Sequence, residues 1–121
     1  MTIEVALPLL LGGLVDGRCY PDVTPDNAIF PLLVYQGAGG EAHDYLERKL
    51  PGSEHYRIQV VSWAKTRLAA NGLALQVRQR IIEQGTAFES AKTLGQAVGL
   101  YEDALKLYGS RQDFGIWIKV R

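Results

Sequence analysis

Two stretches of this chain alternate apolar with other residues one by one, and this alternation most constrains the fold. The stretch 55–63 carries on one face Tyr56, Ile58 and Val60. The stretch 114–121 carries on one face Phe114, Ile116, Ile118 and Val120. Because successive side chains of a β-strand point to opposite faces, both stretches are predicted to be strands with one face towards a core.

A helical pattern lies between these two strands. Thr66 is a suitable N-cap residue and Gly85 a suitable stop, so a helix is predicted between them. Its apolar residues recur at three- and four-residue spacing, which places them on one helix face: Ala70, Leu73, Ala74, Val77 and Ile81. The positions predicted for the core are Ile58, Val60, Val77, Ile81 and Ile116.

Weaker signals complete the predicted fold. Thr2 is a suitable cap for a first helix that runs towards Leu11, and Pro8 is expected to kink this helix or delay its start. Pro31 opens a strand over residues 32–36, and a broken strand is predicted over residues 87–94 and 97–102. The last strand is expected to follow a turn at residues 109–111. Residues 20–27, with two prolines, predict a loop.

These elements predict an α+β fold of one domain over residues 1–121. The sheet is expected to be mostly antiparallel and four-stranded, packed by one long helix and a short N-terminal helix. Thirteen Lys and Arg balance thirteen Asp and Glu, so direct recognition of a nucleic acid is not expected. The apolar stretch 5–15 is too short to cross a membrane, no basic leader precedes it, and a cytoplasmic protein is expected.

The segment from Gly37 to Gly52 combines glycines with charged residues and few apolar anchors, so a loosely held loop or a short helix over residues 41–50 is expected. Gly37, Gly39 and Ala42 fit the dinucleotide fingerprint, but only weakly, because no long crossover helix follows. A small ligand-binding domain or enzyme that uses the turn from Gly37 to Gly40 is the alternative from another functional class.

Other candidate chemistry is sparse. His43 and His55 lie near Asp44 and Glu54, but not at the spacing of a helix-borne metal pair, so no metal and no cofactor are expected. Cys19 is the only cysteine, and it is expected to be buried packing. No catalytic residues are predicted.

The two tryptophans, Trp63 and Trp117, both fall on the face of their strands that points away from the predicted core. A large aromatic side chain on the second face of a sheet is usually covered. The cover is either the protein's own helix or a neighbouring subunit, since aromatic residues are enriched at interfaces.

Several segments follow one another in a recognisable order and spacing: residues 17–25 (GRCYPDVTP), 30–36 (FPLLVYQ), 57–64 (RIQVVSWA) and 75–78 (LQVR), and then the closing apolar strand. In this order and spacing the chain resembles the tail-terminator, or tail-completion, proteins of long-tailed phages and prophages. The resemblance covers most of the chain, and no single motif in it is diagnostic.

The resemblance implies a structural virion protein and not an enzyme. Such a subunit forms a homo-oligomeric ring, commonly a hexamer, that ends the tail tube and joins the tail to the head connector. It would be found in the phage tail, and in the cytoplasm of the bacterial host during assembly. A head-tail adaptor of the same joint is the alternative. The long loop is expected to reach a partner with Glu41, His43, Asp44, Glu47, Arg48 and Lys49.

Overall fold

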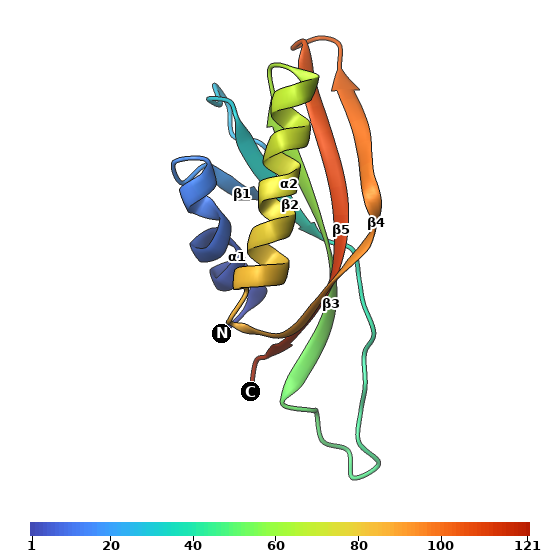
Figure 1. The fold of residues 1–121 in the computed structure, drawn as a ribbon. Helices are drawn as coiled ribbons and strands as arrows, with labels where there is room; N and C mark the ends of the chain where they lie inside the picture. The colour runs from blue at the N-terminus through green and yellow to red at the C-terminus, as the bar shows by residue number, and fades with distance from the viewer.

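A computed structural model describes residues 1–121. Figure 1 shows two layers, a twisted sheet and two helices that lie on one of its faces. The helices are α1 (Ile3–Leu11) and α2 (Arg67–Gln84), and a short 3-10 turn, Gly12–Leu14, follows α1. The strands are β1 (Cys19–Pro21), β2 (Leu32–Gly37), β3 (Ser53–Ala64), β4 (Phe88–Glu102) and β5 (Leu107–Lys119).

The sheet has five strands in the order β1-β2-β3-β5-β4, so the prediction of four strands was wrong. The additional strand, β1, pairs with β2 in parallel, whereas all other pairs are antiparallel. Sequence patterns missed β1 because it is only three residues long and ends in Pro21. Proline is tolerated there because β1 is an edge strand, where an amide is not needed on the open side.

The core lies between the sheet and the helices, and the predicted core positions are confirmed. Ile58, Val60, Val77, Ile81 and Ile116 all belong to one cluster of 17 buried residues. The predicted cap of α2 is also confirmed, because the Ala69 amide donates to the Thr66 hydroxyl at 3.1 Å.

The N-terminal helix differs from its prediction in two details. The Thr2 side chain makes no capping hydrogen bond, and instead its carbonyl oxygen accepts from the amides of Val5 and Ala6. The helix begins at Ile3 and Pro8 lies inside it, so Pro8 did not delay its start. Leu7 and Leu11 are fully buried on the face of the helix that points towards the sheet. This burial explains why the helix continues through Pro8, which has no backbone N–H to donate.

The β4–β5 hairpin is longer and more continuous than predicted. β4 is one strand rather than two, because a register shift between Leu94 and Val98 absorbs Gly95, whose φ is +86°. The Gln112 side-chain amide donates to the Gly95 carbonyl at 3.0 Å and stabilises this irregularity. β5 begins at Leu107, so the predicted turn at residues 109–111 was wrong. The turn lies at residues 103–106 instead, with Lys106 at φ +54°.

Candidate functional site: the arm between β2 and β3

The connection between β2 and β3, residues 38–52, extends well beyond the end of the sheet (Figure 1). We call these residues the arm. The arm contains no helix, so the predicted short helix over residues 41–50 is absent. It carries all six residues that were predicted to reach a partner: Glu41, His43, Asp44, Glu47, Arg48 and Lys49.

The outgoing half of the arm is fixed to β3 by backbone hydrogen bonds. The Ala38 amide donates to the Arg57 carbonyl at 2.7 Å, and the Arg57 amide donates to the Gly39 carbonyl at 2.8 Å. Gly40 follows at φ +134°, with its backbone pressed against the His55 carbonyl oxygen. A Cβ at position 40 would overlap that oxygen, so only glycine fits here.

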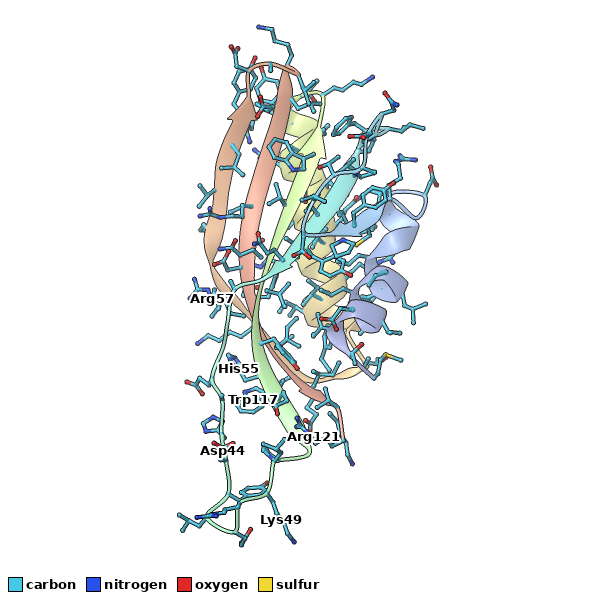
Figure 2. The ribbon with its side chains drawn as sticks, turned by 180° about the vertical axis from the view of Figure 1, so that it is seen from behind. Asp44, Lys49, His55, Arg57, Trp117 and Arg121 are labelled. Atoms are coloured by element: carbon cyan, nitrogen blue, oxygen red, sulfur yellow. The ribbon has the colours of Figure 1, made fainter.

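Three aromatic rings then hold the arm against the sheet. The His43 ring stacks on Trp117, with 5.8 Å between ring centroids and 15° between planes, and the His55 ring lies 5.0 Å from Trp117. The Glu41 amide also donates to Nδ1 of His55 at 3.0 Å, so a neutral His55 carries its proton on Nε2. Figure 2 shows His55 and Trp117 beside the outgoing half of the arm.

Gly115 of β5 makes room for this aromatic contact. Gly115 is the cross-strand partner of Arg57, one pleat away from the pair of His55 and Trp117. An added Cβ at position 115 would lie 3.1 Å from Nε2 of His55. The arm therefore covers Trp117 on the face of the sheet opposite α2, and the protein's own helix does not.

The returning half of the arm is fixed by the last two residues of the chain. The amides of Val120 and Arg121 donate to the Gly52 carbonyl at 2.9 and 3.0 Å. The Arg121 guanidinium donates to the Pro51 carbonyl at 2.8 Å and forms an ion pair with Glu54 at 2.6 Å. Both ends of the arm are thus held, and its direction is set by the sheet (Figure 2).

The tip of the arm, residues 44–50, closes on itself and contacts little else. The Tyr45 amide donates to the Lys49 carbonyl, and the Arg48 amide donates to the Tyr45 carbonyl, both at 3.0 Å. This turn leaves Leu46 fully exposed, and Leu50 is 59% exposed. Apolar side chains grouped on a projecting tip are typical of a contact with another molecule.

Trp63, the other predicted interface residue, lies at the far end of the same sheet face. It pairs with Gly109 of β5, whereas Trp117 pairs with His55, so the structure does not bring the two tryptophans together. Trp63 is half-buried and lines a hollow of about 190 Å³ with Phe30, Leu105 and Leu107. This hollow does not include any residue of the arm.

Three features were considered for chemistry: the two histidines, Cys19 and the glycine turn. No group of three His, Cys, Asp or Glu side chains is close enough to hold a metal ion. Burial raises the pKa of the Cys19 thiol to about 11, so this thiol is protonated at neutral pH and a poor nucleophile. The glycine turn leads into the arm and an antiparallel strand, without the helix and parallel strand of a dinucleotide site.

Sequence reasoning missed the residues that hold the arm: Gly40, His55, Gly115 and Arg121. The one available signal was the pair Gly115 and Trp117, two residues apart on the face of the last strand that points away from the core. A glycine beside a large aromatic residue indicates that another segment packs against that face. The pairing of His55 with Trp117 needs the strand register, which composition does not reveal.

No helix of the chain is both long enough and apolar enough to cross a membrane.

Comparison with known proteins yields a likeness of fold. No protein-family model and no curated protein sequence matches this chain. Among solved structures, a chain of the virion of a native gene transfer agent particle is similar, with a TM-score of 0.67 and 12% identical residues. The similarity covers 98% of this chain and 95% of that chain. At this identity the likeness shows that the two chains share a fold.

Proposed function

We propose that this protein is a structural component of a phage-like particle, a tail terminator that forms a homo-oligomeric ring. The observation that carries the proposal is an arm held at both ends and carrying an exposed apolar tip. The fold likeness to a chain of a gene transfer agent virion supports it, because it extends over nearly the whole of both chains. All 121 residues form one domain in this proposal, and the protein has no catalytic role.

The ring, a hexamer, ends the tail tube and joins the tail to the head connector in this proposal. The tail-tube protein and the connector protein are its partners, and it resides in the tail of the particle after assembly in the host cytoplasm. A rigid sheet that positions a projecting loop is a common way to present a binding surface. The arm is therefore the proposed assembly element.

Removal of the gene from a phage or prophage that encodes it tests this function. Electron micrographs are expected to show tails of irregular length and tails without heads, and complementation by the intact chain should restore normal particles. Headless tails of normal length would instead favour a head-tail adaptor. Normal particles from the deletion would contradict both assignments.

A variant of the arm connects this test to the structure. Replacing residues 45–49 by two glycines removes most of the exposed tip, including Leu46, but keeps Glu41 and His43, which contact the sheet. Complementation with this variant is expected to fail although the protein folds. Leu105→Ala, at another exposed turn of the same sheet, is the matched control and should complement normally.

A further inference from the structure

A hollow of about 310 Å³ lies between α2 and the two strands β4 and β5. We call it the α2–β4 hollow. The residues that α2 contributes recur at three- and four-residue intervals, which places them on one face of the helix. They are Arg67, Asn71, Ala74, Leu75 and Arg78. The hollow is therefore built on regular structure and not on a loop.

The hollow exists because β4 is irregular and carries small residues there. The register of β4 shifts between Leu94 and Val98, and from this strand only Gln96, Ala97 and Gly99 line the hollow. An alanine and a glycine leave space that larger side chains would fill. An added Cβ at position 99 would lie 3.3 Å from Nη1 of Arg67, so glycine lets that guanidinium lie close to the strand.

The floor of the hollow is polar, although it belongs to the inner face of the sheet. Further along β5, the inner positions hold apolar core residues such as Phe114 and Ile116. Ser110 and Gln112 continue the same alternation, line the hollow, and are both more than nine-tenths buried. The inner face of the sheet thus changes from apolar to polar where the hollow begins.

The hydroxyl of Ser110 has no hydrogen-bond partner within the protein, whereas the Gln112 amide donates to the Gly95 carbonyl. Ser62, the cross-strand partner of Ser110, is likewise buried without a partner for its hydroxyl. Buried polar groups are nearly always hydrogen-bonded. A buried hydroxyl that faces a hollow and lacks a partner indicates that the hollow holds a polar occupant.

The charge of the hollow is positive, because two arginines and no acidic residue line it. The Arg67 guanidinium is held in place by the carbonyls of Gly109 and Leu100, at 2.6 and 2.7 Å, and by the ring of Tyr108. These partners are neutral, so Arg67 contributes an uncompensated positive charge at a fixed position.

Arg78 is the second positive charge, and its guanidinium is free. Arg78 is half-buried and takes part in none of the five ion pairs of the protein. The exposed Glu83 lines a neighbouring hollow and forms no ion pair with Arg78. Water alone would satisfy the Ser110 hydroxyl, but it would leave both arginine charges without a counter-charge.

We propose that the α2–β4 hollow binds a small molecule that carries an oxyanion, either a carboxylate or a phosphate group. Arginine binds both groups through paired N–H donors. Arg78 forms the ion pair, the Ser110 hydroxyl and the Asn71 amide donate hydrogen bonds, and Arg67 adds its fixed charge. The volume lies at the lower end of the range for ligand sites, about 300 to 1,000 Å³, which fits a small ligand. This inference does not depend on the proposed ring function, because one chain forms the whole site.

Nuclear magnetic resonance of the ¹⁵N-labelled full chain tests the site. Sodium phosphate and sodium succinate are added separately at constant ionic strength, with sodium chloride as the reference. The amides of Asn71, Ser110 and residues 96–99 are expected to shift and to saturate. Saturation by phosphate alone identifies a phosphate ligand, and saturation by succinate alone identifies a carboxylate ligand. The absence of saturating shifts with both anions would mean that the hollow holds only water, and would overturn the proposal.

Variants then separate a built site from general attraction of anions. Arg78→Gln is expected to weaken binding at least about tenfold, and Ser110→Ala, which changes no charge, about threefold. Arg48→Gln is the matched control, because Arg48 is also exposed and without an ion pair but lies at the arm tip. It should leave the affinity unchanged.

The same spectra show whether each variant is folded. If Ser110→Ala disturbs the fold, Asn71→Ala removes a donor at an exposed position of α2 and is expected to weaken binding to a similar extent. Equal weakening by Arg78→Gln and Arg48→Gln would identify an adventitious ion only and would overturn the site. Unchanged affinity of Arg78→Gln would overturn it as well.

Discussion

The two faces of the sheet are covered by different kinds of contact. On the inner face, α1 and α2 bury a continuous cluster of 17 residues by apolar packing. On the outer face, the arm is held by one stack of rings, a few hydrogen bonds and one close glycine contact. The first kind of contact is dense and redundant, whereas the second depends on single side chains.

In the function that we propose, this difference separates stability from assembly. Apolar burial stabilises a fold roughly in proportion to the area removed from water. The arm buries little area, but its fixed ends determine where the exposed tip lies. Changes on the inner face should therefore be read in the free energy of unfolding, and changes in the arm should be read in assembly.

The largest effect on stability is expected from the inner face. Ile58→Ala removes a buried side chain from the centre of β3, so the free energy of unfolding should fall by about 2 to 5 kcal/mol. Urea denaturation measures it. Leu46→Ala, at the exposed tip, should change the same quantity by less than about 0.5 kcal/mol. Equal effects would contradict the division between the two regions.

A smaller effect is expected at alkaline pH from Cys19, another residue of the inner cluster. Burial raises the pKa of its thiol from 9.0 to about 11, so the folded state favours the neutral form. The unfolded thiol ionises first, and this stabilising contribution is complete below pH 9 and lost as the pH rises to about 11. A shift of this size corresponds to roughly 3 kcal/mol.

The comparison of the parent protein with Cys19→Ala isolates this contribution. Burial also raises the pKa of Tyr35, but Tyr35 is present in both proteins. Urea denaturation between pH 8 and pH 11 should show a steeper loss of stability in the parent protein. Parallel curves would mean that Cys19 ionises as easily in the folded state as in the unfolded one.

A still smaller loss of stability is expected for Trp117→Ala. This change removes the ring on which His43 and His55 pack, and loss of such a contact costs about 1 kcal/mol. The more specific result is faster hydrogen exchange of the Glu41 amide, which donates to His55. Trp63→Ala, at the other end of the sheet, is the control and should leave that amide unchanged.

The smallest effect on stability is expected from shortening the tip. Replacement of residues 45–49 by two glycines changes the loop length modestly, and the closure entropy changes by less than about 0.6 kcal/mol. The same variant is expected to lose assembly entirely, as measured by complementation. If this variant did not fold, the tip would contribute to stability as the inner face does, and the contrast between the two regions would be wrong.

Sequence patterns predicted the inner layer well because it is periodic. The spacing of Val77 and Ile81 indicates the buried face of α2, and the alternation around Ile58 and Ile116 indicates the paired strands. Each apolar residue in these patterns indicates the same buried face as the others. A single Pro or Gly does not overturn it, as Pro8 inside α1 illustrates.

The rest depended on contacts between distant residues. β1 is too short to show a period, and its pairing with β2 arises from tertiary structure. Gly40 fits the arm against His55, and Arg121 contacts Pro51 across 70 positions of sequence. The position and charge of the loop could be predicted from composition, but its anchors could not, because each of them is one specific pair.

Both ends of the chain lie close to the base of the arm. The Met1 amino group donates to the Lys119 carbonyl at 3.4 Å, and Arg121 contacts the returning half of the arm (Figure 1). Anything fused to either end would therefore emerge near the place where the arm returns to β3. If the arm docks on a partner as we propose, a bulky tag at either end is expected to obstruct that docking, and the emission of a small fluorophore at either end is expected to change when the arm binds.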